Sequence, residues 1–391
     1  MPKFSVVIPS KDRPQLIRWA VQTVLRQSFG DFELVISDNS DDERTREALE
    51  VFDDPRLCYH RSGGLSMPDN WEFAASKATG DYVCVLQDKQ VMHFDALERL
   101  ARVVDDCEPQ VVRWEWDEIK PYGLGRRIRS FGGDGSITRE DPLTVLRTVF
   151  EGDYFEGKAL LPIPHYSAIR ADLLDEIRRG PTGRLCTAVS PDITLAIQAT
   201  NLADEITYFD ASLVGFSDVS VSNGVSVRLK GKLGNEFIRS LGGESVFCSH
   251  VPVKIRNVYG SIYNDIMKLR AENGGRLAEL EPDWCNYYCG VYEEIQQAIA
   301  AGVDMSPETA AWEGALQGEP ESLQAQVRAG VTRQQEKRLS LGRRVRKSAA
   351  VQGVTRTARS FVKGRLLRDP LWRCREMVEY VEWRAKRAGH A

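Results

Sequence analysis

Short apolar runs alternate with helical repeats along the N-terminal part of the chain. The apolar runs predict buried strands at residues 4–8, 32–36, 57–60 and 82–86. Between them, apolar positions recur at helical spacing and predict helices at residues 14–27, 43–52 and 71–78. Strands and helices that alternate in this way predict an α/β fold, with a mostly parallel sheet covered by helices on both faces.

The pattern is weaker after residue 110. Residues 111–114 and 205–209 predict two further strands. Residues 190–200 predict a helix, with Ser190 as its N-cap and Pro191 in its first turn. From residue 226 onward the pattern is mainly helical, and the end of the chain is a basic amphipathic helical tail. We therefore predict three parts, at residues 1–225, 226–332 and 333–391.

Polar side chains follow three of the predicted strands at the point where each strand ends. These groups are Pro9–Arg13, Asp38–Ser40 and Gln87–Lys89. In mostly parallel sheets, ligands bind beyond the carboxyl ends of the strands. Three polar clusters at three strand ends therefore predict a ligand site at that edge of the sheet.

Charge is distributed unevenly along the chain. The net charge is −4, but residues 333–391 hold 17 Lys/Arg and 5 Asp/Glu, a local net charge of +12 that leaves −16 for the rest. We expect this tail to bind an anionic membrane surface, with a solvated charged helix as the alternative. It has few aromatic residues and resembles no nucleic-acid-binding module, so nucleic acid is not an expected partner.

Two further features bear on the location and redox state of the protein. No apolar run approaches the roughly 20 residues that span a bilayer, and no signal peptide pattern follows Met1. We therefore expect a cytoplasmic protein, peripheral at the inner face of the membrane. The eight cysteines are scattered and predict buried reduced thiols. Cys285 and Cys289 lie one helical turn apart, but no second Cys/His pair stands nearby to complete a zinc site.

Five segments, in order, resemble the family 2 glycosyltransferases of bacterial type, whose fold is called GT-A. They are Ser5–Arg13, Leu34–Ser40, Ser66–Ala74, Ala78–Val83 and Ser190–Asp192. The resemblance covers about the first 190 residues, and the order of the segments makes it specific although each alone is weak. It implies transfer of a sugar from a nucleotide sugar, most commonly a UDP-sugar, to a saccharide or lipid-linked acceptor in the synthesis of cell-surface glycans.

The resemblance also implies a donor site at the strand ends. Its expected members are Pro9, Ser10, Asp12, Arg13, Asp38, Ser40, Asn70, Trp71 and Asp88. Several have a structural alternative. Asp38 would form an Asx-turn with the two residues after it, and Asn70 would cap a helix. Trp71 would pack in the core, while Pro9 and Ser10 would only end their strand.

The sequence departs from the family at its metal-binding motif. Where the family has an Asp-x-Asp that holds a divalent cation, this chain has Gln87, Asp88 and Lys89. Mg²⁺ and Mn²⁺ prefer carboxylate oxygens, so we expect either no cofactor or a weakly bound ion at Asp88. Two interpretations remain. Either Lys89 neutralises the donor pyrophosphate in place of the metal, or the chain has lost turnover and only binds.

Inverting transfer needs a base beside the acceptor hydroxyl. The resemblance assigns this role to Asp192, although Asp192 would also favour its helix simply by lying near the positive end of the dipole. Asp153 and Glu156 are reserve candidates, and His165 is expected to be a core residue. A dinucleotide or P-loop enzyme is not expected, because neither glycine-rich motif is present. The alternative function is a catalytically inactive scaffold that binds a sugar nucleotide or a membrane.

Overall fold

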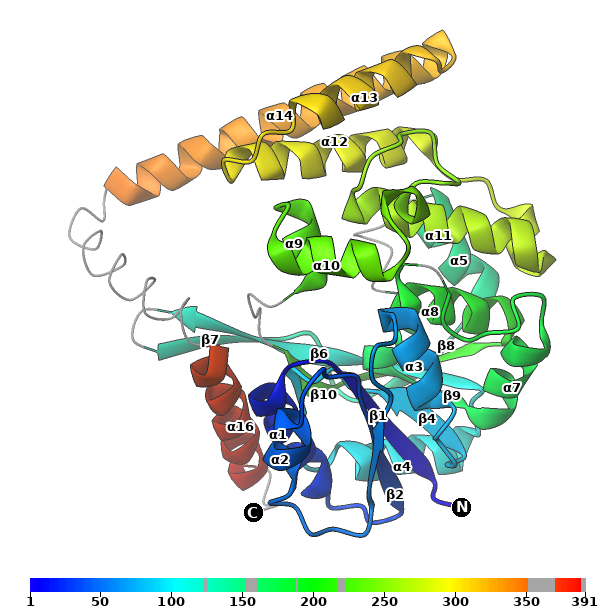
Figure 1. Cartoon of the computed structure of the whole chain (residues 1–391), viewed down its shortest axis with the longest axis vertical. Coiled ribbons are helices and arrows are strands. Elements are labelled where there is room, and N and C mark those ends of the chain that lie inside the picture. The colour runs from blue at the N-terminus through cyan, green and yellow to red at the C-terminus, as the bar shows by residue number, and fades with distance from the viewer. Residues whose placement is uncertain (123–124, 152–159, 188, 217–221, 351–369, 388–391) are drawn as a thin grey trace.

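The chain folds around one large sheet, with helices on both faces and a further layer of helices beyond one of them (Figure 1). The computed structural model describes residues 1–122, 125–151, 160–187, 189–216, 222–350 and 370–387. Side chains are not described for 120–127, 337–350, 370–376 and 387. The strands are β1 (Phe4–Ser10), β2 (Phe32–Asp38), β3 (Leu57–Arg61), β4 (Tyr82–Val85), β5 (Gln90–Met92), β6 (Val111–Tyr122), β7 (Gly125–Ser130), β8 (Ile137–Glu140), β9 (Ser167–Arg170) and β10 (Ile206–Phe216).

The strand order is β3-β2-β1-β4-β9-β6-β10-β5, with β7 beside β6 and β8 beside β10. The first four strands of the chain are parallel, as are β6 and β10. Strand β9 is antiparallel to both β4 and β6 and joins these two groups. The prediction of an α/β fold with a mostly parallel central sheet is confirmed.

Alternating side chains of the central strands point to opposite faces of the sheet. Val6 and Ile8 pack toward α1 (Pro14–Leu25) and α4 (Ala96–Cys107). Val7 packs on the other face, toward α3 (Met67–Ala75), α7 (Ala171–Arg179) and α8 (Pro191–Leu202). Helix α2 (Arg44–Leu49) follows β2. Both faces are therefore covered, which is why these strands consist of almost uninterrupted apolar residues.

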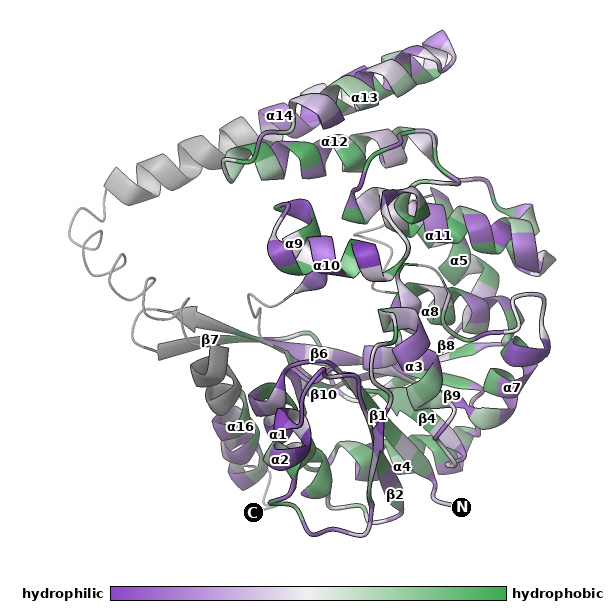
Figure 2. Cartoon of the chain, viewed as in Figure 1, coloured by the Kyte–Doolittle hydropathy of each residue, from purple (hydrophilic) through white to green (hydrophobic). Residues whose placement is uncertain are grey.

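The segment after residue 222 builds the helical layer that the sequence predicted. Its helices are α9 (Asn223–Arg228), α10 (Lys232–Ser240), α11 (Val258–Asn273), α12 (Trp284–Ala300), α13 (Ser306–Gln317) and α14 (Glu321–Ala350). Figure 2 shows hydrophilic and hydrophobic residues alternating along α11 and α13, as expected of helices with one face toward a core. That core is shared, because buried residues of α5 (Pro142–Glu151) and α8 belong to the same cluster. A domain boundary at residue 225 stays a prediction.

Helix α16 (Pro370–Arg387) returns to the sheet and lies beside α1 (Figure 1). Met377, Val378 and Val381 are buried there, in a cluster that also contains Leu16 of α1 and Val91 of β5. The apolar face of this helix is therefore taken by the fold and does not face a membrane. No helix among the described residues is both long and apolar enough to cross a bilayer.

Three element boundaries differ from the sequence prediction for identifiable reasons. Helix α3 begins at Met67 rather than near Trp71, because the Ser66 hydroxyl accepts the N–H of Asp69 at 3.3 Å and caps the helix. Strands β6 and β10 run well beyond their apolar starts, since they pair with each other along most of their length. Polar residues in these strands gave no strand signal in the sequence, and pairing extends them.

Candidate active site

The carboxyl ends of β1, β2 and β4 meet at one edge of the sheet, as the polar clusters predicted. Ser10 at the end of β1 lies in register with Asp38 at the end of β2. The Ser10 hydroxyl donates to Asp88 Oδ2 at 2.8 Å, and Arg13 Nη1 donates to Asp88 Oδ1 at 3.1 Å. The fold therefore brings two residues of the first cluster onto one residue of the last, the Asp88 carboxylate, which is only 3% exposed.

Asp38 adopts the geometry of the Asx-turn alternative. Its Oδ1 accepts the N–H of Ser40 at 3.0 Å, and its Oδ2 accepts the hydroxyl of Tyr59 at 2.7 Å. Burial raises the pKa of the Tyr59 phenol, which therefore stays a donor to this carboxylate. Asp38 is fully buried, so in this structure it shapes the end of β2. Its contact with a nucleotide stays a prediction.

The neighbouring turn residues are similarly engaged. Ser40 Oγ accepts the N–H of Asp12 at 2.8 Å, which ties the turn after β1 to the turn after β2. Asp12 has a positive φ of 55°, a conformation that Asp tolerates better than most residues. Pro9 lies inside β1 and pairs with Ser37, so the idea that it ends the strand is wrong.

Helix α3 supplies the two remaining candidates. Asn70 Oδ1 accepts the hydroxyls of Ser37 at 2.6 Å and Ser62 at 2.8 Å, so it holds the strand end and does not cap a helix. Trp71 is partly exposed and meets the ring of His165 edge-on, with 5.2 Å between ring centroids. It also packs against the buried cluster of β4, α7 and α8, so the alternative of core packing holds in part.

The turn after β4 does not offer the ligands of a divalent cation. Both oxygens of Asp88 already accept hydrogen bonds, and the amide nitrogen of Gln87 lies 2.6 Å from His165 Nε2. The Lys89 ammonium lies 5.8 Å from the centroid of the Phe216 ring, at the end of β10. Nowhere in the described part of the chain do three His, Cys, Asp or Glu side chains gather as a metal site would need. The side chains of this turn therefore do not fit a hard cation.

Asp192 lies in the first turn of α8, with its side chain 32% exposed. Its Oδ2 is 3.8 Å from Nε2 of His165, which belongs to a short 3-10 helix at Pro164–Tyr166. Burial lowers the pKa of His165 to about 4, although the Asp192 carboxylate acts in the opposite direction. His165 is therefore neutral near pH 7, and its Nε2 atom faces both Gln87 and Asp192.

Several residues at this site escaped the sequence analysis. His165 was expected to be a core residue, and it is buried, but its contacts place it between two candidate clusters. Glu72 and Asp265 bind the backbone that leads into α8, and nothing in their sequence surroundings indicates this. Asp153 and Glu156, the reserve candidates for the base, lie outside the described residues.

The sheet order, the helices on both faces and the site at the carboxyl edge define a GT-A fold. Residues 5–178, a little less than half of the chain, match the family described as glycosyl transferase family 2. A solved structure, S. aureus TarS 1-349 in complex with UDP-GlcNAc, aligns over 83% of this chain and 84% of its own, with a TM-score of 0.50. At 15% sequence identity this similarity shows a shared fold.

Two relatives illustrate the sequence similarity. The GalNAc(5)-diNAcBac-PP-undecaprenol beta-1,3-glucosyltransferase of Campylobacter jejuni is 26% identical over 167 residues, which are 40% of this chain and 51% of that protein. The PGL/p-HBAD biosynthesis glycosyltransferase of Mycobacterium bovis is 29% identical over 112 residues, 28% of this chain and 44% of that protein. The chain thus spans about half the length of the relatives it matches.

Proposed function

We propose that this chain is an inverting glycosyltransferase that moves a hexosyl group from a nucleotide sugar, most commonly a UDP-sugar, to a hydroxyl of a saccharide or lipid-linked acceptor. The observation that carries the proposal is the position of Asp192, a partly exposed carboxylate at the carboxyl edge of the sheet. The names of the relatives support the reaction class, and one relative is named for an undecaprenol-linked substrate. The UDP-GlcNAc complex of TarS supports the class of donor.

In the proposed reaction, Asp192 accepts the proton of the acceptor hydroxyl while that oxygen attacks the anomeric carbon. The bond to the nucleoside diphosphate breaks on the opposite face of the sugar, which inverts the configuration. Because His165 is neutral near pH 7, it does not form a charged ion pair with Asp192. Lys89 provides positive charge for the departing diphosphate. The donor is held by Pro9, Ser10, Asp12, Arg13, Asp38, Ser40, Asn70, Trp71 and Asp88.

The variant Asp192→Asn tests the base assignment, because it keeps the shape of the side chain and removes the proton acceptor. We expect turnover to fall about 100-fold or more, while the affinity for the donor changes little. Release of nucleoside diphosphate measures turnover, and a thermal-shift titration with the same nucleotide sugar measures affinity. Normal turnover in this variant would move the role to Asp153 or Glu156.

The second candidate function is a scaffold that binds a sugar nucleotide or a membrane without transferring sugar. The observation that favours it is the turn after β4, where Asp88 already accepts hydrogen bonds from Arg13 and Ser10 and no second acidic residue is present. A panel of nucleotide sugars, assayed with and without Mn²⁺, separates the two functions. Transfer or hydrolysis of any of these donors excludes the scaffold, whereas binding without either reaction favours it.

A further inference from the structure

The backbone that leads into α8 is held from two sides by carboxylates that belong to other elements. Glu72 of α3 binds the backbone of residues 185 and 186, and Asp265 of α11 binds the backbone of Ser190. Both contacts precede Asp192, which lies two residues after Ser190, the N-cap of α8. The direction in which Asp192 points therefore depends on where these two carboxylates fasten the chain.

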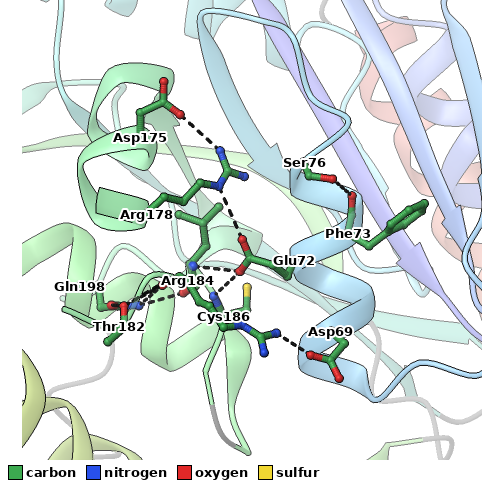
Figure 3. Close-up of polar contacts among 11 residues, drawn as sticks. Asp69, Glu72, Phe73, Ser76, Asp175, Arg178, Thr182, Arg184, Cys186 and Gln198 are labelled. Carbon is green, nitrogen blue, oxygen red and sulfur yellow. Dashed lines mark hydrogen bonds and ion pairs between the residues drawn. The ribbon is translucent and has the colours of Figure 1, made fainter. Parts of the chain in front are cut away.

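Glu72 is the contact from α3, and Figure 3 shows it between α3 and the segment that follows α7. Its Oε2 accepts the backbone N–H groups of Leu185 at 2.9 Å and Cys186 at 3.0 Å. Its Oε1 lies 3.5 Å from Nε of Arg178. A second ion pair, Arg184 Nη2 to Asp69 Oδ1 at 2.5 Å, joins the same two elements. Helix α3 carries Trp71, so this contact connects the donor side of the site with the segment before the base.

Asp265 is the contact from the helical layer, and it is fully buried. It accepts the backbone N–H groups of Val189 at 3.2 Å and Ser190 at 2.7 Å. The sequence predicted that Ser190 itself would cap α8, but its side chain makes no capping hydrogen bond. Asp265 instead fixes the two residues just before the first turn of α8, from about 75 residues further along the chain.

We propose that Glu72 and Asp265 are positioning residues for Asp192, so that the C-terminal helical layer is part of the catalytic unit through Asp265. The inference rests on the proposed function, in which Asp192 is the base. A base must lie within hydrogen-bond reach of the acceptor hydroxyl, and a displacement of about 1 Å at a reacting group costs turnover by up to about 100-fold. The Glu72 carboxylate of α3 and the Asp265 carboxylate of α11 restrict such a displacement, because they hold residues 185–186 and 189–190, just before Asp192.

The Glu72 contact is tested by comparison with Asp175, which also pairs with Arg178, at 3.4 Å, but makes no recorded contact with Leu185 or Cys186. We expect Glu72→Ala to lower kcat at least about 10-fold with the KM for the donor within about 2-fold. Glu72→Gln keeps an acceptor oxygen and should recover kcat to within about 3-fold. Asp175→Ala should leave kcat unchanged, which separates loss of the loop contact from loss of the Arg178 pair.

The Asp265 contact has a matched control in Glu294 of α12. Glu294 is also buried and also accepts two backbone N–H groups, from Val258 at 3.1 Å and Tyr259 at 2.8 Å, but at the start of α11. We expect Asp265→Ala and Glu294→Ala both to lower the melting temperature, and only Asp265→Ala to lower kcat, at least about 10-fold. Where Asp265→Ala does not fold, Asp265→Glu against Glu294→Asp carries the comparison, because each keeps the carboxylate and shifts it by one methylene group, with kcat at least about 3-fold lower in the first.

Amide hydrogen exchange provides a readout that does not need turnover. Exchange should become faster at Leu185 and Cys186 in Glu72→Ala, and at Val189 and Ser190 in the Asp265 variants. The two hypotheses fail differently. Normal turnover in Asp192→Asn overturns the base assignment. If Asp192→Asn is inactive but Glu72→Ala and the folded Asp265 variants keep full kcat, the base assignment holds and only the positioning role is overturned.

Discussion

Asp88 and Lys89 are adjacent in the turn after β4, yet the fold uses them differently. Asp88 is buried and accepts hydrogen bonds from Ser10 and Arg13, so its carboxylate holds the ends of β1 and β4 together. Lys89 is placed differently, with its ammonium 5.8 Å from the centre of the Phe216 ring. At the scale of single residues, the carboxylate of this turn is therefore engaged within the fold, and the turn carries one ammonium and no second carboxylate.

We predict that donor use needs no divalent metal and depends on Lys89. EDTA should leave turnover unchanged, because the turn lacks hard ligands and an ammonium repels a cation. Lys89→Ala should reduce turnover by about 100-fold or more, since the leaving diphosphate loses its stabilising charge. Release of nucleoside diphosphate, measured with EDTA, Mg²⁺ or Mn²⁺ present, provides the comparison.

The matched control for this prediction is Lys232→Ala, which removes an 89% exposed ammonium on α10 and should not change turnover. Strict dependence of the wild-type protein on Mg²⁺ or Mn²⁺ would contradict the prediction and would mean that acids elsewhere complete a metal site.

At the scale of elements, α16 is attached to the sheet by a buried polar cluster. The Tyr380 hydroxyl donates to Asp117 Oδ2 at 2.6 Å, and Arg384 Nη1 donates to the same oxygen at 3.2 Å. His93 Nε2 lies 3.2 Å from this oxygen, and Asp117 is fully buried. A buried carboxylate costs free energy unless it is paired, so α16 and the middle of β6 stabilise each other.

We predict that Tyr380→Phe lowers the free energy of unfolding by about 1–3 kcal/mol, because it removes one donor from a buried carboxylate. Urea denaturation followed by circular dichroism measures the change. Lys386→Gln, at an exposed position of the same helix, should change it by no more than about 0.5 kcal/mol. Equal effects of the two substitutions would show that the hydrogen bond to Asp117 contributes nothing.

The predicted membrane contact now rests on the basic part of α14 and the residues after it. Arg343, Arg344, Arg346 and Lys347 form the densest basic cluster there, and their side chains lie outside the described set. The apolar residues that would enter the interface are Leu339, Leu341, Val345, Val351 and Val354, of which the last two lie wholly outside the described residues.

Liposome sedimentation tests this prediction. Binding should require anionic lipid and fall with added salt, since each basic residue near such a surface contributes about 1 kcal/mol before screening. Replacing the four basic residues with Gln should remove the binding, while Lys232→Gln should not. Equal binding to neutral liposomes, or none to anionic ones, would contradict it.

At the scale of the whole molecule, two buried groups give stability opposite dependences on pH. Burial lowers the pKa of His165 to about 4, so its contribution is complete above its ordinary value of 6.5 and is lost as the pH falls through about 4. Burial raises the pKa of Asp265 from 3.8 to about 7, so its contribution is complete below 3.8 and is lost as the pH rises through about 7.

We predict that the free energy of unfolding of Asp265→Asn, relative to that of the wild type, rises between pH 5 and 7. The variant no longer carries a group that must ionise in a buried site, and the difference grows by at most about 1.4 kcal/mol for each pH unit. Urea denaturation at several pH values measures it. A constant difference across this range would mean that Asp265 ionises at an ordinary pKa in the folded protein.

The sequence alone determined the general fold and the edge of the sheet at which the site lies. Apolar runs of strand length, separated by helical repeats, leave few alternatives to a sheet covered on both faces, because a strand without polar positions must be buried on both sides. Polar residues at strand ends then mark the edge where the chain turns and a ligand has access. For the same reason the sequence predicts that Ser10, Arg13 and Asp88 lie at this edge.

The tertiary structure decided which side chains meet across distant parts of the chain. Both carboxylate oxygens of Asp38 accept hydrogen bonds, from Tyr59 and Ser40. Asp265 binds the backbone at the start of α8 from a helix about 75 residues further along the chain. The last helix hides its apolar face against α1, which its amphipathic pattern alone did not reveal. Periodicity reports only whether a residue faces inward, whereas the partner it finds there depends on how separate elements pack.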